Sequence, residues 1–220
     1  MKVLFFTLLV LLSACEPQKK DTENLPWKIS ITDSGATRVM GMDIGEITLK
    51  GISIRLNHIA NTLMFETSKG ELNVESYFGR IMIGLLEGRI IADLDASDEF
   101  LDRERKSSTG REATPNNNWQ YKLSIKAEKE IIKMRVWRMV YMPVTQYEEK
   151  QIKFFGEPEE TIKVTETAVY RLYPKKGLAI LWDSNGGEIF YYAAPKEFAR
   201  LKASLPMESV AVPKKPVVKD

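Results

Sequence analysis

Short apolar runs separated by turn-forming residues recur along most of this chain, and they constrain its fold more than any other feature of the sequence. Alternation with a period of two is typical of half-buried β-strands, whereas glycine, proline and asparagine favour the turns between them. Because the runs are short and the turns tight, the strands are expected to pair antiparallel. The strand candidates are Leu63–Glu66, Asn73–Phe78, Ile81–Leu86 and Arg89–Leu94 in a first group, and Ala168–Tyr173, Leu178–Asp183 and Glu188–Ala193 in a second.

Helix signals accompany both groups of strands. Thr48 is the expected N-cap of one helix, because apolar residues at helical spacing follow it. Ser97 is the expected cap of a second helix, whose sequence begins with acids and ends with bases. Residues 145–148 have the pattern of a capping box, and Gly156 is placed to end the helix that follows.

Two modules are expected, each a helix beside an antiparallel meander. Residues 107–118 are polar and rich in turn formers, which indicates a boundary loop between a first module at 27–106 and a second at 119–205. Residues 206–220 are rich in proline and lysine and predict a disordered tail. The expected fold class is therefore α+β, with two tandem modules that form one or two antiparallel sheets packed by helices.

The N-terminus has the pattern of an exported protein. Lys2 supplies a positive charge ahead of the apolar run Val3–Leu12, which is too short to span a bilayer. Residues 1–14 are therefore predicted to be a signal peptide, and the polar residues 15–26 a tether. Cys15 is the only cysteine, so the chain can form no internal disulfide.

The segment Leu12–Cys15 resembles the lipobox of bacterial lipoproteins, in which an apolar residue and two small residues precede a cysteine. The resemblance implies a diacylglyceryl thioether on Cys15, cleavage before that residue and acylation of the new amino group, and several acyl chains anchor a protein stably. Glu16 in place of aspartate implies the outer membrane, on its periplasmic face. The alternative is an ordinary leader cut by the general signal peptidase, with Cys15 as a bystander.

A second resemblance covers the C-terminal group of strands. Residues 155–158 (Phe-Gly-Glu-Pro), 170–173 (Tyr-Arg-Leu-Tyr) and 176–183 (Lys-Gly-Leu-Ala-Ile-Leu-Trp-Asp) resemble the SmpA/OmlA (BamE-like) family, in which a helix precedes a three-stranded meander. Residues 41–94 carry a weaker form of the pattern. Two copies side by side are similar to the tandem arrangement of β-lactamase inhibitor proteins. The resemblance implies a fold and transfers no catalytic or binding position.

No catalytic residue, metal site or cofactor is predicted. His58 is the only histidine, no nucleophile-elbow pattern accompanies it, and zinc sites of histidine or cysteine are excluded by count. The densest acidic run lacks the glycine that a calcium loop needs at its sixth position, so a strand end and a helix start are expected there. That run comprises Asp93, Asp95, Asp98 and Glu99. A pair of carboxylates distant in sequence stays open, and a formal net charge of +2 gives no reason to expect nucleic acid.

Aromatic residues on two predicted strands are the candidate interaction surface. Trp137 and Tyr141 share one face of a strand, and a second strand has aromatic rings on both faces. The residues of that second strand are Phe190, Tyr191 and Tyr192. One face is expected to be core and the other free to bind a partner. The alternative is that helices or the other module cover both faces.

The expected function is that of an outer-membrane-anchored periplasmic lipoprotein, a non-enzymatic protein-interaction module with a role in envelope assembly. Its expected partners are the membrane, through lipid on Cys15, and an envelope protein. The alternative is a binder or inhibitor of a soluble periplasmic enzyme or small ligand, which a concave apolar pocket would favour. An enzyme ranks third, and a cleft with two or more buried carboxylates would favour it.

Overall fold

The structure is a computed structural model, and it describes residues 24–207 except 85, 109 and 116. The predicted signal peptide, Cys15, most of the tether and most of the C-terminal tail lie outside the described residues. Among the residues described, no helix combines the length and the apolar composition that a membrane crossing requires.

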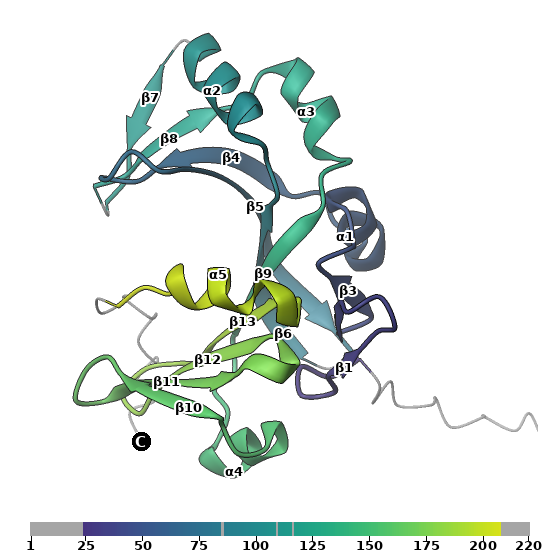
Figure 1. Ribbon diagram of the computed structural model, residues 1–220, viewed down its shortest axis with the longest axis vertical. Helices are drawn as coiled ribbons and strands as arrows, with labels where there is room; N and C mark the ends of the chain where they lie inside the picture. The colour runs from purple at the N-terminus through teal and green to yellow at the C-terminus, as the bar shows by residue number, and fades with distance from the viewer. Residues whose placement is uncertain (1–23, 85, 109, 116, 208–220) are drawn as a thin grey trace, which may run out of the picture.

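A ten-stranded antiparallel sheet is the main element of the structure, and its strand order is β10-β11-β12-β13-β9-β6-β5-β4-β8-β7. In Figure 1 the sheet curves, so that it has a concave and a convex face. Its strands are β4 (Asn61–Glu66), β5 (Leu72–Ile83), β6 (Leu86–Leu94), β7 (Arg111–Ala113), β8 (Trp119–Lys122), β9 (Val136–Pro143), β10 (Glu160–Lys163), β11 (Ala168–Tyr173), β12 (Leu178–Asp183) and β13 (Ile189–Ala193).

The other elements are a small sheet and short helices. The three-stranded sheet consists of β1 (Ser30–Ile31), β2 (Thr37–Val39) and β3 (Met42–Ile44). The α-helices are α1 (Leu49–Leu56), α2 (Asp98–Ser107), α3 (Ile125–Ile131), α4 (Glu149–Ile152) and α5 (Phe198–Ala203), and the 3-10 helices are Lys153–Phe155, Pro174–Lys176 and Pro195–Glu197. Figure 1 shows α1, α2, α3 and the small sheet outside the curve, and α5 inside it.

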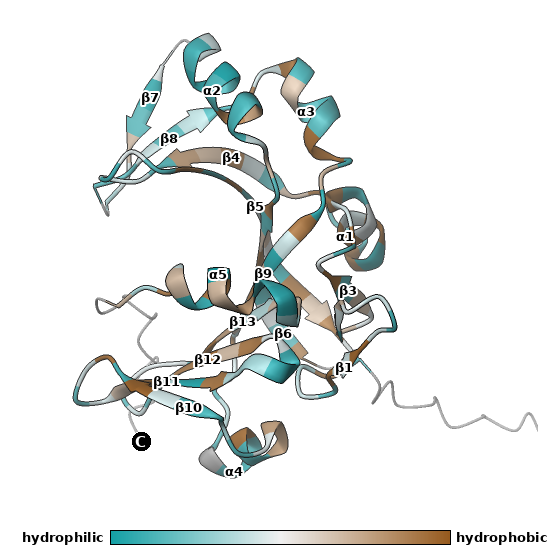
Figure 2. Ribbon diagram, viewed as in Figure 1, coloured by the Kyte–Doolittle hydropathy of each residue, from teal (hydrophilic) through white to brown (hydrophobic). Residues whose placement is uncertain are grey.

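Strand alternation sends the apolar side chains of the large sheet into two separate clusters. The larger cluster lies on the convex face, where Met64, Ile90 and Tyr141 pack with residues of the small sheet and of α1, α2 and α3. The smaller lies on the concave face, where Phe198 and Leu201 of α5 pack against the strands β9 to β13. Figure 2 shows the corresponding hydrophobic segments along the strands, and a largely hydrophilic α2.

The predicted α+β class, with two BamE-like modules packed by helices, is wrong. The structure is mostly β, with 41% strand against 24% helix, and the helices are few and short. The two predicted groups of strands join in one sheet, because β6 of the first pairs with β9 over the register from Gly88–Pro143 to Leu94–Val136. In addition, β8 follows the predicted boundary loop but pairs with β4, which precedes it.

The helix starts predicted from local sequence signals agree with the structure better than the predicted fold class does. The side chains of Thr48, Ser97 and Ser124 each accept a hydrogen bond from a backbone N–H in the first turn of the next helix, as N-caps do. The predicted capping box at 145–148 is wrong, since Glu148 and Gln151 form the box at the start of α4 instead. The break expected between the predicted strands Ile81–Leu86 and Arg89–Leu94 is also wrong, because Gly88 lies within β6.

Gly88 is in a strand because the ring of Tyr141, on the neighbouring strand β9, lies directly against its α-carbon. Replacing Gly88 with valine is expected to lower the free energy of unfolding by about 1–3 kcal/mol, since the fully buried ring has no room to retreat. Chemical denaturation measures the change. The control is Gly110→Ala, where an added methyl meets open space. Equal stability of Gly88→Val and wild type would contradict this packing of β6 against β9.

Candidate functional site in the concave face

The aromatic residues predicted as an interaction surface are core residues. Trp137 is 7% exposed and Tyr191 5%, while Tyr141, Phe190 and Tyr192 are fully buried. Phe190 stacks on Phe155, which follows α4, and the hydroxyl of Tyr192 donates to the carbonyl of Pro26. Since α5 covers the other face of the same strands, both faces are closed. At these strands the structure therefore matches the alternative interpretation, in which both faces of the sheet are covered.

The concave face is covered over only part of its width. The helix α5 closes the half built from β9 to β13, and the half built from β4, β5 and β6 stays open (Figure 1). Pairing register aligns Leu63, Glu75, Asp93 and Arg138 in one row across β4, β5, β6 and β9. The residues of the open half and of the row's end are here called the concave site. They are Asn61, Leu63, Phe65, Asn73, Glu75, Tyr77, Ile91, Asp93 and Arg138.

The residues of the concave site line two cavities. One of about 260 Å³ is mostly apolar, and among the described residues that line it Glu75 alone is charged. Its lining consists of Asn61, Leu63, Phe65, Glu75, Tyr77 and Ile91. A second cavity of about 380 Å³ adjoins the site at Asn73 and Asp93, and it is also lined by Arg200 and Ser204 at α5 and by Asp98 and Leu101 of α2. Trp137 also lines it, with the guanidinium of Arg200 3.9 Å from its ring.

A buried ion pair forms the end of the concave site. Nε of Arg138 donates to Oδ2 of Asp93 at 2.6 Å, and the two side chains are only 13% and 3% exposed. Nη1 of Arg138 donates to the hydroxyl of Ser204 at 2.7 Å, which ties the pair to the end of α5. A buried charge is stable only when it is paired and hydrogen-bonded, and in this ion pair the hydrogen bonding is incomplete. Within the described residues, Oδ1 of Asp93 has no hydrogen-bond donor.

Glu75 is the carboxyl group that faces the open cavity. Burial raises its pKa to about 7, and the negative charge of Asp93 on the neighbouring strand contributes. The amide Nδ2 of Asn73 donates to Oε1 of Glu75 at 2.6 Å, and this bond and the charge of Arg138 act in the opposite direction. The concave site therefore holds a carboxyl group that gains or loses its proton near neutral pH, which is common at functional sites.

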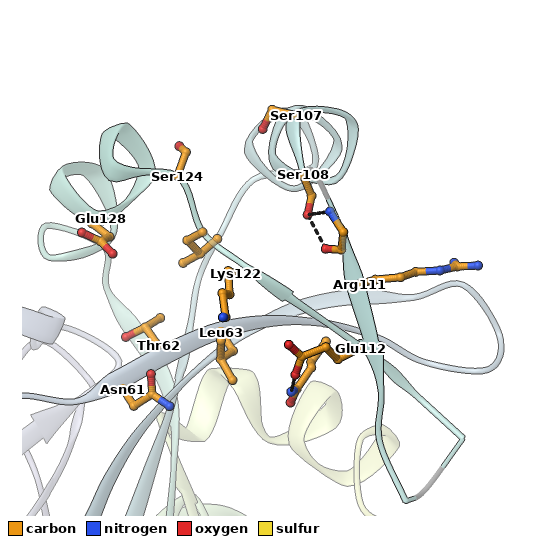
Figure 3. Close-up of a pocket in the computed structure, with 13 residues that line it drawn as sticks. Asn61, Thr62, Leu63, Ser107, Ser108, Arg111, Glu112, Lys122, Ser124 and Glu128 are labelled. Atoms are coloured by element: carbon orange, nitrogen blue, oxygen red, sulfur yellow. Dashed lines mark hydrogen bonds between the residues drawn. The ribbon is translucent and has the colours of Figure 1, made fainter.

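A third cavity, of about 850 Å³, lies beside the concave site at the end of β8. In Figure 3, Glu112 and Lys122 extend toward the concave side, whereas Ser107, Ser108 and Ser124 lie on the side of α2 and α3. Its charged side chains, Arg111 among them, are exposed, so water already solvates them. Among the described residues that line it, none has a buried polar atom without a hydrogen-bond partner, so this cavity is the weaker candidate site. Asn61 and Leu63 connect it to the concave site.

The other candidates considered from the sequence are either exposed or have structural partners. His58 is exposed just after α1. In the acidic run, Asp93 pairs with Arg138 and Asp95 pairs with Arg135 and Arg200, while the next two acids occupy the first turn of α2. No group of three or more histidine, cysteine, aspartate or glutamate side chains within the described ranges is placed to hold a metal ion.

Sequence reasoning missed Glu75 and Arg138. A signal for Glu75 exists, because Asn73, Glu75 and Tyr77 alternate with the buried residues Val74 and Ser76, and so share one face. The pattern does not reveal that Asp93 lies opposite, since pairing register is a long-range property. Comparison with known protein families, characterised proteins and solved structures finds no match to this chain.

The stability of the protein is expected to depend on the protonation of Glu75. Because its pKa rises from 4.5 to about 7 on folding, the folded chain holds this proton more tightly, and the stabilisation is complete below pH 4.5 and lost as the pH rises through 7. Glu75→Gln mimics the protonated carboxyl, so it is expected to raise the free energy of unfolding at pH 8 by up to about 3 kcal/mol.

At pH 4.5 the same substitution is expected to change stability by less than about 1 kcal/mol, since wild-type Glu75 is then protonated when folded. Urea denaturation at the two pH values measures the difference. The control is Glu112→Gln, which removes an exposed carboxylate from the same side of the sheet. Destabilisation of Glu75→Gln by an equal amount at both pH values would contradict the account.

Proposed function

We propose that this protein is a lipid-anchored envelope protein that binds a partner protein in the concave site. The observation that carries the proposal is the half-covered concave face, where apolar side chains surround one partly buried carboxyl group. Tyr77, at the rim, is 42% exposed, and Leu63, Phe65 and Ile91 are half-buried. Grooved faces with aromatic residues and few polar groups are typical of recognition sites.

The size of the apolar cavity favours a protein partner over a free small molecule. Ligand pockets typically enclose about 300–1,000 Å³, whereas this cavity has about 260 Å³. That volume suits one inserted side chain, and such insertion is how binding hot spots work in protein interfaces. The trough formed with the adjoining cavity that reaches α5 then receives the neighbouring part of the partner.

The path of the N-terminal segment supports a tethered arrangement. Pro26 lies against the convex side, where its carbonyl accepts the Tyr192 hydroxyl, and Trp27 packs edge-on against Tyr147. The segment thus enters the fold on the face opposite the concave site (Figure 1). A protein held by lipid on Cys15 at the outer membrane keeps its binding face free in this arrangement.

Site-specific photocrosslinking in cells tests the binding face. A photoreactive residue at Tyr77 is expected to give a discrete adduct with one envelope protein, because the position lies at the rim of the cavity. The matched control is Ile54, which is 70% exposed on α1, on the convex side. The same adduct from position 54, or adducts from neither position, would contradict binding in the concave site.

The anchor has a separate test. Cys15→Ser removes the acylated atom and is expected to shift the protein from the membrane fraction to the soluble fraction, because no other stable anchor is proposed. Immunoblotting of fractionated cells measures the distribution, with Ser13→Ala as the control that keeps a small residue in the lipobox. Retention of Cys15→Ser in the membrane fraction would show that lipid on this residue is not what holds the protein.

A further inference from the structure

The polar atoms that the concave site leaves without partners are all acceptors. Within the described residues, Oδ1 of Asp93 and Oδ1 of Asn73 are buried and receive no hydrogen bond. Both residues line the cavity next to α5, and Asp93 is 2% exposed. A buried acceptor without a donor costs about 1–3 kcal/mol, and these two oxygens, which are closed to solvent, add negative charge and partial negative charge beside Glu75.

The two arginines near the site are already engaged. Arg138 binds Asp93 and Ser204, and Arg200 binds Asp95 while stacking on Trp137. Lys122 is exposed on β8, at the far end of the same row, with Leu63 between it and Glu75. The row therefore holds two carboxyl groups, Glu75 and Asp93, against one buried guanidinium, so an ionised Glu75 lacks a cation of its own.

The walls of the smaller cavity fit the stem of a long side chain. Leu63, Phe65, Tyr77 and Ile91 surround Glu75 there. Arginine and lysine bury their methylene stems against apolar surface while their charged ends reach polar groups. Rings such as those of Phe65 and Tyr77 also attract cations, and a planar guanidinium can donate to several acceptors at once.

We propose that the concave site recognises an arginine side chain of the partner protein, with its guanidinium on the Glu75 carboxylate and its stem between Leu63, Phe65 and Tyr77. This inference rests on the proposed function, because it names the group that the partner inserts. It also explains the position of Glu75, for which the fold alone gives no reason.

Protonation of Glu75 competes with the guanidinium. Asp93 faces Glu75 from β6, Arg138 from β9 and Lys122 from β8, while Tyr191 on β13 and Arg200 on α5 lie beyond Arg138. If only the ionised form of Glu75 binds and its pKa is about 7, affinity for a guanidinium is expected to rise roughly thirtyfold from pH 5.5 to pH 8.

A pair of matched probes tests the inference directly. Butylguanidinium has the charge and stem of arginine, and butylurea has nearly the same shape without the charge. The protein is the full chain with Cys15→Ser, labelled for NMR, and the signals followed are the amides of β4 and β5 and the Glu75 carboxyl carbon. Butylguanidinium is expected to bind saturably at pH 8, at least tenfold more tightly than butylurea, and to lower the pKa of Glu75.

Two variants localise the effect. Glu75→Gln is expected to abolish the tenfold preference for butylguanidinium, whereas Glu112→Gln, which removes an exposed carboxylate on the same side of the sheet, is expected to keep it. Equal binding of the two probes, or a preference that survives Glu75→Gln, would overturn the inference. In either case a crosslink from Tyr77 would still support the proposed function, so the two failures are distinguishable.

Crosslinking in cells tests whether the cation comes from a partner protein. If a partner supplies an arginine, Glu75→Gln is expected to reduce the crosslinked adduct from Tyr77 at least fivefold, and Glu112→Gln to leave it unchanged. An undiminished adduct in Glu75→Gln, together with selective butylguanidinium binding, would mean that a small solute supplies the cation. That result would overturn the assignment to a partner's side chain.

Discussion

Antiparallel pairing of β6 with β9 is the constraint on which the rest of the structure depends. It joins a meander of β4, β5 and β6 to a meander of β10 to β13, and so makes one sheet of ten strands. Its register also brings the groups of the concave site together, because Asp93 lies opposite Arg138 on one side and Glu75 on the other. A shift of one residue would send these side chains to the convex face, into the apolar core.

The two faces of this sheet are stabilised to different extents. The convex face is covered along its length by helices and the small sheet, and its cluster includes most of the fully buried aromatic rings. On the concave face, α5 closes only the half near β13, and the other half exposes apolar side chains and holds a carboxyl group whose ionised form is destabilised by burial. Features that cost stability are concentrated at functional sites in proteins, which is why the concave site is the stronger candidate.

Local features of the fold were predictable from the sequence. The predicted strands Ala168–Tyr173 and Leu178–Asp183 coincide with β11 and β12, because alternation and flanking turns are local signals. Gly88 falls between two predicted strands, since glycine usually marks a turn, yet in the structure it lies within β6 and makes room for the ring of Tyr141 from a distant segment. No pattern predicts α5, because its six residues are too few for a periodic apolar face to be recognised.

The candidate site was harder to predict from the sequence than the strands, for a physical reason. Alternation identifies residues that share a face, as Phe190 and Tyr192 do, but it does not show what covers that face. Conversely, Glu75 became a candidate only when strand order placed Asp93 and Arg138 beside it. Charge neighbours drawn from three strands are a property of the sheet and not of any single segment.

The register of β5, β6 and β9 gathers Glu75, Asp93 and Arg138 into a partly desolvated site. The most direct measurement is an NMR titration of the side-chain carboxyl carbon of Glu75 in the full chain, assigned by comparison with Glu75→Gln. A midpoint near pH 7 is expected, because burial and the charge of Asp93 both oppose ionisation. A midpoint near 4.5, the value of an unperturbed glutamate, would contradict it.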